Sequence, residues 1–193
     1  MKKIVLASNN KHKIKEFNEI LNDYEILSLR DIGYFEDIVE DGKSFFENSM
    51  IKAQAVMNFL RGKGELCPVI ADDSGLCVNA LGGAPGIYSA RYSGDHDDSA
   101  NRKKLIEDLK QKEDKFAYFN CTLVVLYPDG EYKTVEGKVY GEIIDEERGD
   151  TSFGYDCLFM SDDLGKTFGE ATNEEKNSVS HRGRALQKLK EIL

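Results

Sequence analysis

The chain has 193 residues, of which 40% are hydrophobic and 32% charged, and its formal net charge is −9 at pH 7. A chain of this length forms one medium domain or two tightly joined lobes, since a domain averages roughly 150 residues. The negative charge argues against nonspecific binding to nucleic acid or to an anionic membrane as the main task. No stretch approaches the ~18 to 20 apolar residues of a membrane span, and the first residues lack the apolar core of a signal peptide. We therefore expect a soluble cytoplasmic protein with no nucleic-acid or membrane partner.

The apolar pattern of the first half predicts alternating strands and helices. In chain order, the expected elements are a strand at 3–7, a helix carrying Ile14, Phe17, Ile20 and Leu21, a strand at 24–29, a helix from Ser44 to about Arg61, and a strand from 68 that runs into a turn at Asp72-Asp73-Ser74-Gly75 and leaves as a second strand. Ser44 and Glu47 have the spacing of a capping box, which supports a helix start at Ser44.

The second half predicts a hairpin and a helical end. In chain order, we expect a loop over 82–94, a helix from about Ser99 to Lys112, a strand at 116–127, a turn at Pro128-Asp129-Gly130, a returning strand at 131–144, an aromatic loop from Ser152 into a short strand, and helices from Thr172 to Leu193. Thr172 and Glu175 have capping-box spacing, and Ser180 can cap a final helix. The tight turn makes one strand pair antiparallel. The predicted fold is α/β, an elongated central mixed β-sheet with flanking helices, in which residues 1–193 form a single domain with two lobes around an active-site cleft.

Ser8, Asn10 and Lys13 lie where the first strand passes into the first helix. Free backbone N–H groups and the positive end of the helix dipole meet there, so the turn can bind phosphate, and Lys13 can add a positive charge. The alternative is an ordinary helix cap with solvated lysines. Lys52 in the second helix is another candidate cation, for which a solvated lysine is again the alternative.

Acidic residues occur before, within and after the second predicted helix, at Glu36, Glu40, Asp41, Glu47, Asp72 and Asp73. Adjacent aspartates in a strand point to opposite faces, so one of Asp72 and Asp73 can face a cleft while the other anchors the turn. Carboxylates beside phosphates are typical of a magnesium site. The alternative is an Asx-turn at the end of a strand.

Two further segments have the chemistry of a nucleoside site. The aromatic loop Phe153-Gly154-Tyr155-Asp156 can stack on a base, or its phenylalanine can belong to the core. The segment 176–184 concentrates Lys176, His181, Arg182 and Arg184 in an otherwise acidic chain, which favours an anion or an acceptor-rich base edge over a solvated charge run.

Four cysteines, Cys67, Cys77, Cys121 and Cys157, are widely spaced and lack the paired spacing of a zinc site. We expect buried free thiols. The three histidines are too scattered to form a histidine metal cluster, so any metal would be a hard cation held by carboxylates.

Six segments, in this order and spread over residues 7–186, together resemble one family: ASNNKHK, EDGKSFFENSMIKA, ADDSGL, GGAPGIYSARYSG, SFGYD and EEKNSVSHRGRAL. The chain resembles the inosine triphosphate pyrophosphatase family, which hydrolyses non-canonical purine nucleoside triphosphates. The resemblance covers nearly the whole chain. It implies a Mg²⁺-dependent hydrolase that converts ITP, dITP and XTP to the monophosphate and pyrophosphate, and so removes them from the nucleotide pool, and it implies a homodimer.

The resemblance also implies roles for individual residues. Asp73 would be the catalytic carboxylate and a metal ligand, with Glu40 as the second acidic ligand, although Glu36 is close enough to remain an alternative. The substrate would be bound by Ser8, Asn9, Asn10, Lys11, His12, Lys13, Lys52, Ser74, Phe153, Gly154, Tyr155, Asp156, Lys176, His181 and Arg182. In this resemblance, the residues from Ser8 to Lys13 and Lys52 would bind the triphosphate. The residues from Phe153 onwards would bind the nucleoside.

The chain departs from the commonest family pattern at Asn9, Ser49, Ser152 and Cys157. Positions 9 and 152 are often glycines, so side chains there restrict how closely the backbone approaches phosphate or base. Two rival functions remain: the related septum-formation-inhibitor-like pyrophosphatases, which prefer modified pyrimidines, and a non-catalytic nucleotide-binding module. The Ser-His-Arg segment and GGAPGIYSARYSG argue against the first rival, and the presence of Asp73 and Lys13 argues against the second.

Overall fold

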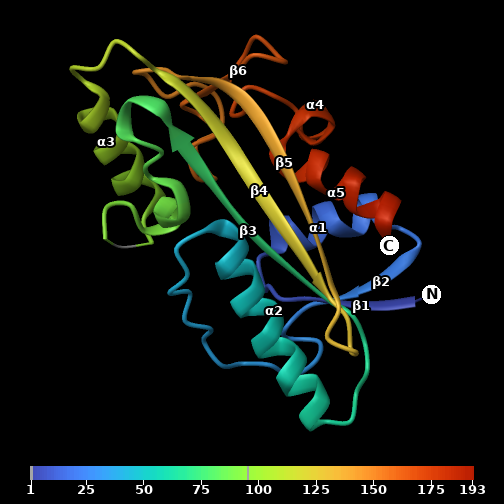
Figure 1. Cartoon of the computed structure of the whole chain (residues 1–193). Coiled ribbons are helices and arrows are strands. Elements are labelled where there is room, and N and C mark those ends of the chain that lie inside the picture. Colours follow the sequence, from blue (N-terminus) through green and yellow to red (C-terminus); the bar gives the residue numbers. More distant parts are fainter. Residues whose placement is uncertain (1, 95) are drawn as a thin grey trace. The chain divides into compact units, whose positions relative to one another are not determined.

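The structure is a computed structural model that describes residues 2–94 and 96–193 (Figure 1). Its elements in chain order are β1 (Lys2–Leu6), α1 (Lys11–Ile20), β2 (Tyr24–Leu27), α2 (Phe45–Gly62), β3 (Val69–Val78), the 3₁₀ helices η1 (Asn79–Leu81) and η2 (Gly86–Arg91), α3 (Asp98–Leu109), β4 (Phe116–Leu126), β5 (Tyr132–Ile143), β6 (Phe159–Ser161), α4 (Asn173–Val179) and α5 (His181–Ile192). The strands form one six-stranded sheet in the order β2-β1-β3-β4-β5-β6.

The sheet is mixed, as the sequence predicts. Strand β1 pairs in parallel with both β2 and β3, whereas β5 pairs antiparallel with β6. Strands β4 and β5 are neighbours joined by the turn at 127–131, where Gly130 N–H donates to the Tyr127 carbonyl at 3.0 Å. A connection this short joins only antiparallel strands, so the predicted hairpin is confirmed.

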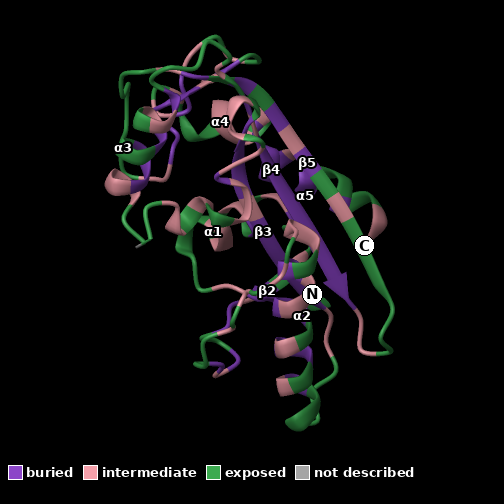
Figure 2. Cartoon of the chain, turned by 60° about the vertical axis from the view of Figure 1, so that its left-hand side comes forward, coloured by how far each residue is buried: buried purple, intermediate pink, exposed green. Residues whose placement is uncertain are grey.

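The chain divides into two compact units. Unit 1 comprises Met1–Asp73, Cys121–Glu136 and Ala185–Leu193, and unit 2 comprises Ser74–Asn120 and Gly137–Arg184. The predicted α/β class is therefore correct, while the predicted cleft stays a prediction. Strands β3 and β4 are buried along most of their length (Figure 2).

Unit 1 has a hydrophobic cluster on each face of its sheet. One contains Val5, Ala7, Val69, Ala71, Val124 and Leu126 with the inner side of α2. The other contains Ile4, Leu6, Ile70, Cys121, Leu123 and Val125 with Phe17 of α1 and the end of α5. Successive strand residues thus alternate between the α2 face and the α1 face, which is the period of two that a strand buried on both sides requires.

Unit 2 has one hydrophobic cluster. Its core brings together Leu76, Val78, Leu105, Leu109, Phe119, Tyr155, Cys157, Phe159 and Phe168. Phe119 packs edge-on against Phe159, with ring centroids 4.8 Å apart. This core anchors the loop 153–156, because Tyr155 of the loop is 4% exposed and belongs to the hydrophobic cluster.

The predicted caps hold the helices where the sequence places them. Ser44 Oγ accepts from Glu47 N–H at 3.1 Å, but the Glu47 carboxylate accepts from Lys43 N–H instead of closing the box on Ser44. The box at Thr172 and Glu175 is complete. Ser180 Oγ accepts from Gly183 N–H at 3.0 Å and so caps α5.

Two predictions of local structure are wrong. The segment Asp72-Asp73-Ser74-Gly75 does not turn, because β3 continues through it from Val69 to Val78. The segment 82–94 is not an open loop, since η2 occupies 86–91. Ser89 Oγ stabilises this 3₁₀ segment by donating to the Gly86 carbonyl at 2.6 Å and accepting from Leu76 N–H at 2.9 Å.

All four cysteines are free thiols, as expected, and three are buried, whereas Cys67 is only partly buried. Within the described part of the chain, every helix is too short or too polar to span a bilayer.

Gly141 in β5 gives a test of the sheet. A Cβ at this position would lie 2.1 Å from the Met160 carbonyl oxygen of β6, so Gly141→Ala must push the two strands apart. We expect the free energy of unfolding to fall by about 1 to 3 kcal/mol, the cost of overpacking, in urea titrations. Gly62→Ala is the matched control, because a Cβ there meets nothing within 4 Å. Equal stability of the two variants would contradict the strand pairing.

Candidate active site

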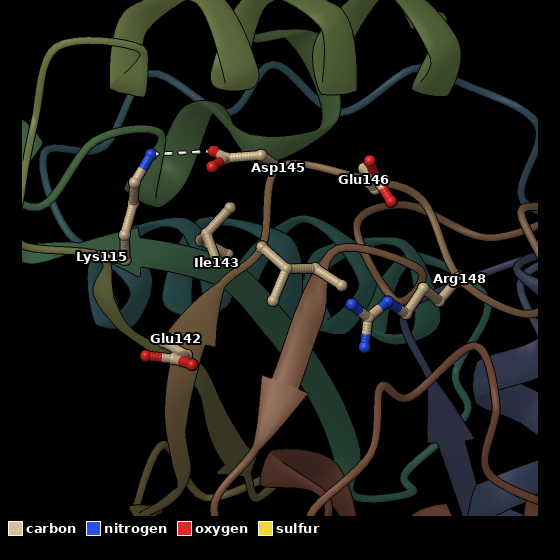
Figure 3. A pocket seen from close by; sticks show the side chains of 7 residues that line it. Lys115, Glu142, Ile143, Asp145, Glu146 and Arg148 are labelled. Carbon is tan, nitrogen blue, oxygen red and sulfur yellow. Dashed lines mark hydrogen bonds and ion pairs between the residues drawn. The ribbon is translucent and has the colours of Figure 1, made fainter.

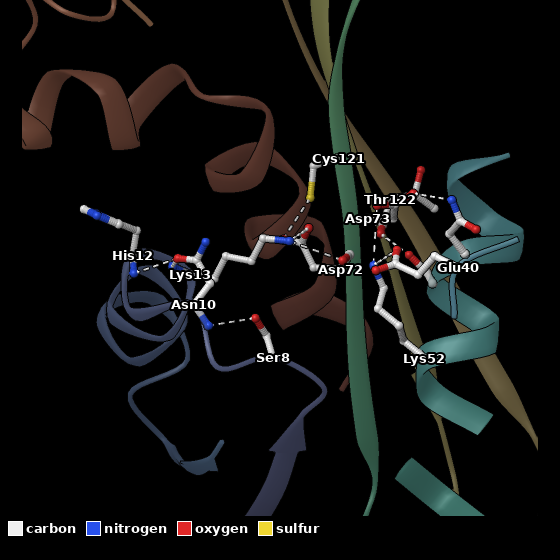
Figure 4. A network of polar contacts seen from close by, with 12 residues as sticks. Ser8, Asn10, His12, Lys13, Glu40, Lys52, Asp72, Asp73, Cys121 and Thr122 are labelled. Carbon is white, nitrogen blue, oxygen red and sulfur yellow. Dashed lines mark hydrogen bonds and ion pairs between the residues drawn. The ribbon is translucent and has the colours of Figure 1, made fainter. Parts of the chain in front are cut away.

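Two adjacent aspartates of β3 point to opposite faces of the sheet in unit 1. Ala71 belongs to the α2-facing core and Ile70 to the α1-facing core, so the alternation carries Asp73 toward α2 and Asp72 toward α1. Figure 4 shows the result, with Lys13 reaching Asp72 on one side of the strand and Lys52 reaching Asp73 on the other. The prediction that the two carboxylates diverge is confirmed.

Asp72 is paired with Lys13. The Lys13 Nζ lies 2.8 Å from Asp72 Oδ1 and 3.3 Å from the Asp72 carbonyl oxygen, and the Asp72 side chain is 0% exposed. Cys121 Sγ of β4 lies 3.7 Å from Asp72 Oδ2. The prediction that the second aspartate anchors a turn is therefore wrong: with β3 unbroken there is no turn to anchor, and the carboxylate orients the Lys13 ammonium instead.

Asp73 and Glu40 share the ammonium of Lys52. The Lys52 Nζ lies 2.6 Å from Glu40 Oε2 and 3.4 Å from Asp73 Oδ1, and its side chain is only 10% exposed. Burial by itself lowers the pKa of Lys52, but attraction to the carboxylates outweighs burial and the pKa lies above its ordinary value. Lys52 is therefore protonated at pH 7, and it is a largely buried lysine and not a solvated one.

The environment of Asp73 disfavours its charge. Burial raises the pKa of Asp73 above its ordinary value, and the Lys52 ammonium opposes this rise without cancelling it, while Glu40 adds to it. A carboxylate with a raised pKa is a stronger base than an ordinary aspartate. Buried carboxylates with a shifted pKa and a specific charged partner are candidates for functional groups.

Asn48 contacts Asp73, a role to which the sequence analysis does not point. It is 1% exposed, its Nδ2 donates to Asp73 Oδ2 at 3.2 Å, and its Oδ1 accepts from Gly42 N–H at 2.9 Å. Asn48 thus ties the acidic loop to the carboxylate of Asp73. Its spacing gives the signal that could have found it, because it precedes Lys52 by one helical turn on α2.

The donor set fits a divalent cation of the Mg²⁺ type. Mg²⁺ uses one or two carboxylates and completes its shell with water and phosphate oxygens, and Glu40 and Asp73 supply two carboxylates that converge on one positive charge. Over residues 2–94 and 96–193, no group of three or more acidic, histidine or cysteine side chains is arranged for a metal ion. Of the two acidic alternatives, Glu40 contacts Lys52, whereas Glu36 is exposed beside Tyr34.

Asn10 caps α1, as one part of the alternative interpretation held, but Lys13 is paired with Asp72 and is not a solvated lysine. Phosphate binding at this turn stays a prediction. Asn10 Oδ1 accepts from the N–H groups of His12 and Lys13 at 2.9 and 3.2 Å, and Ser8 Oγ accepts from Asn10 N–H at 3.1 Å. Asn9, Lys11 and His12 are exposed around this cap. The cap orients the start of α1 and so holds Lys13 one turn away, at Asp72.

In unit 2, the aromatic loop meets the first residue of the basic segment. Lys176 of α4 forms an ion pair with Asp156, and its Nζ lies 5.2 Å from the centroid of the Phe153 ring. Tyr155 OH donates to the Ser89 carbonyl at 2.7 Å. The structure therefore brings Phe153, Asp156 and Lys176 together, as one site would require.

His181 and Arg182 begin α5 and are 7% and 4% exposed. The His181 ring stacks on Phe119, with centroids 4.9 Å apart and planes at 15°. Arg184 bonds elsewhere, to the Lys138 carbonyl and to Asp163. Burial at the start of a capped helix shows that the Ser-His-Arg segment is not a solvated charge run. Ser74, the remaining predicted substrate residue, follows Asp73 in β3.

Three of the four departures from the family pattern have local partners. Ser49 Oγ donates to the Thr122 carbonyl of β4 at 3.0 Å, and Asn9 Oδ1 accepts from Arg30 N–H at 2.9 Å. Ser152 Oγ donates to Asp150 Oδ2 at 2.8 Å. Cys157 is fully buried, and burial raises its pKa to about 11. Each of the three polar replacements forms a hydrogen bond within the chain.

A hollow of about 460 Å³ in unit 2 lies apart from these residues (Figure 3). It is lined by Lys115, Glu142, Ile143, Ile144, Asp145, Glu146 and Arg148. Its lining mixes both signs of charge and contains no aromatic ring on which a base could stack. None of the predicted site residues lines it, so it is a poor candidate for a nucleotide site.

Comparison with known proteins adds an independent observation. The sequence profile of the Ham1 family matches residues 4–192. A protein of Clostridium perfringens named dITP/XTP pyrophosphatase is 52% identical over 199 residues, covering 100% of this chain and 98% of the relative. A protein of the same name from Bacillus subtilis is 48% identical, with the same coverage. The solved structure of the Staphylococcus aureus Ham1 protein superposes with a TM-score of 0.89 at 41% identity, covering 99% of this chain and 97% of that one.

The raised pKa of Asp73 predicts the effect of replacing it. A raised pKa means that the ionised carboxylate is less stable in the folded protein than in the unfolded chain. At pH 7 in EDTA, Asp73→Asn should therefore raise the free energy of unfolding, and the gain should fade as the pH falls through the folded pKa, where protonation removes the same charge. Asp72→Asn removes the carboxylate that is paired with Lys13. This substitution should instead lower the free energy of unfolding by about 1 to 3 kcal/mol. Denaturant titrations at several pH values measure both, and a destabilised Asp73→Asn would contradict this account.

Proposed function

The chain belongs to the Ham1 family, and from that premise we propose that it hydrolyses the non-canonical purine nucleoside triphosphates ITP, dITP and XTP to the nucleoside monophosphate and pyrophosphate. Relatives that match it from end to end carry the name dITP/XTP pyrophosphatase. The observation that carries the proposal is the convergence of Asp73 and Glu40 on Lys52, beside a second carboxylate that holds Lys13. This arrangement supplies a base and two cations.

The reaction is a displacement at the α-phosphorus. Asp73 orients a water molecule and accepts its proton as the water oxygen bonds to phosphorus, and the bridging bond to the β-phosphate breaks as pyrophosphate leaves. Lys13 and Lys52 neutralise the charge that develops on the leaving pyrophosphate. Glu40 and Asp73 would hold Mg²⁺, which supplies charge neutralisation at the phosphate oxygens when it is bound.

Two groups of residues have different roles toward the substrate in this proposal. The turn from Ser8 to Lys13 and Lys52 bind the triphosphate. Ser74 follows the catalytic carboxylate along β3. Phe153 to Asp156, Lys176, His181 and Arg182 bind the nucleoside. Because β3, β4 and β5 each contribute residues to both units, we treat residues 1–193 as a single functional domain.

Base selection follows from hydrogen-bond chemistry at C6 of the purine. Hypoxanthine and xanthine carry an acceptor oxygen there, whereas adenine carries an amino donor. An N–H donor of Arg182 or His181 can bond to the C6 oxygen of hypoxanthine or xanthine. With adenine the same donor faces an amino group and has no acceptor. An unsatisfied buried donor costs about 1 to 3 kcal/mol, and more when it is charged.

The cellular setting is inferred from the resemblance. We propose a cytoplasmic homodimer that acts on free nucleotides and needs neither nucleic acid nor a membrane. The net charge of −9 supports the absence of a nucleic-acid partner. Tyr88 in η2 is 55% exposed, which supports a role of the 82–94 segment in covering a second copy.

Parallel assays of ITP, XTP, dITP, GTP and ATP test the activity. We expect kcat/KM for ATP to be lower than for ITP by roughly 10² or more, since ~1.4 kcal/mol corresponds to a factor of ten. GTP also carries an oxygen at C6, so its rejection should be weaker. Phosphate should be detected only after inorganic pyrophosphatase is added, which identifies pyrophosphate as the product.

The same assay tests the metal. EDTA should abolish hydrolysis, and Mg²⁺ should restore it while the larger Ca²⁺ should not. Release of phosphate without added pyrophosphatase would contradict the proposed bond cleavage. Equal turnover of ATP and ITP would contradict the proposed specificity. Full activity in EDTA would contradict the metal requirement.

A further inference from the structure

Both polar groups of Gly154 are held by one face of α3. Gly154 N–H donates to Asp98 Oδ2 at 2.8 Å, and the Gly154 carbonyl accepts from Arg102 Nη1 at 2.9 Å. Asp98 and Arg102 are four residues apart, so they lie one above the other on the helix. The first turns of α3 therefore clamp a single residue of the loop 153–156 from both sides.

The clamp is itself fixed. Arg102 is 5% exposed, and its Nε donates to Glu147 Oε1 at 2.7 Å, so the guanidinium uses two of its nitrogens at once. The N-cap of α3 is Asp97, whose Oδ1 accepts from Ala100 N–H at 3.1 Å. Asp98 is consequently free from capping and presents its carboxylate to the loop.

The loop needs such support at this residue. Gly154 has φ = +50°, in the left-handed region, and it lies between Phe153 and Tyr155. Tyr155 is anchored in the core of unit 2, whereas Phe153 is only partly buried under the Lys176 ammonium. The conformation of Gly154 thus sets where Phe153 lies relative to its anchored neighbour.

We propose that Asp98 and Arg102 are positioning residues that set nucleoside affinity, by holding Gly154 so that Phe153 and Asp156 are presented in the binding geometry. This inference rests on the proposed function, which assigns 153–156 to the nucleoside. Neither residue belongs to the triphosphate residues of unit 1. Their loss should therefore weaken recognition of the nucleoside and leave the chemical step intact.

The test separates KM from kcat. Asp98→Ala removes the acceptor of Gly154 N–H and should raise KM for ITP about tenfold or more, with kcat within threefold of wild type. Asp98→Asn keeps an acceptor oxygen and should return KM to within threefold. Arg102→Lys, which cannot reach Glu147 and Gly154 together, is a second variant with the same expectation as Asp98→Ala.

Direct binding gives a readout that does not depend on turnover. Calorimetry should show inosine monophosphate bound about tenfold more weakly by Asp98→Ala, and pyrophosphate bound as in wild type. Asp108→Ala is the matched control on the same helix: Asp108 bonds Tyr92 OH at 2.6 Å and Lys104 at 3.0 Å, outside the loop 153–156. Asp108→Ala should change neither KM nor the two binding constants.

The outcomes separate this inference from the proposed function. A wild-type protein that releases no pyrophosphate from ITP would overturn the proposed function itself. An active wild type with KM unchanged in both Asp98→Ala and Arg102→Lys would overturn the inference alone. Equal weakening of inosine monophosphate and pyrophosphate binding would also overturn it, because that result indicates a general structural defect.

Discussion

The alternation of side chains along β3 is the constraint on which the proposed triphosphate and metal residues depend. Because Val69 and Ala71 must pack under α2 while Ile70 packs toward α1, the next two residues have no choice of face. Two adjacent aspartates therefore deliver their carboxylates to different helices. A slip of one residue would exchange their environments and place each beside the other's lysine.

This division fixes the charge balance of unit 1. Lys13 and Lys52 each have a carboxylate partner within 3.4 Å, although the whole chain is acidic. The compensation is unequal. Lys13 has the whole Asp72 carboxylate, while Lys52 is shared by Glu40 and Asp73, which leaves an excess negative charge on the α2 face. A divalent cation bound there would neutralise this excess charge. It would also stabilise the ionised form of Asp73, whose pKa is raised by burial.

Local patterns in the sequence predict the helices, their caps and the opposite orientation of Asp72 and Asp73, because all of these depend on neighbours within four residues. The continuity of β3 through Asp-Asp-Ser-Gly could not be predicted in this way, since these residues favour turns and only pairing with other strands overrides that preference. The partner of each lysine depends equally on tertiary packing. The sequence does not point to Asp98 and Arg102, because both bond to Gly154, which lies more than fifty residues away in the sequence.

The central claim is that Asp73 does the chemistry while Asp72 serves it by orienting Lys13. Steady-state kinetics of Asp73→Asn and Asp72→Asn with ITP at saturating Mg²⁺ test it most directly. The account predicts that Asp73→Asn lowers kcat by about 10² to 10⁴, the range for a general base, with little change in KM. Asp72→Asn should keep more of kcat and raise KM, because Lys13 is displaced from the triphosphate. A kcat for Asp73→Asn within threefold of wild type would contradict the account.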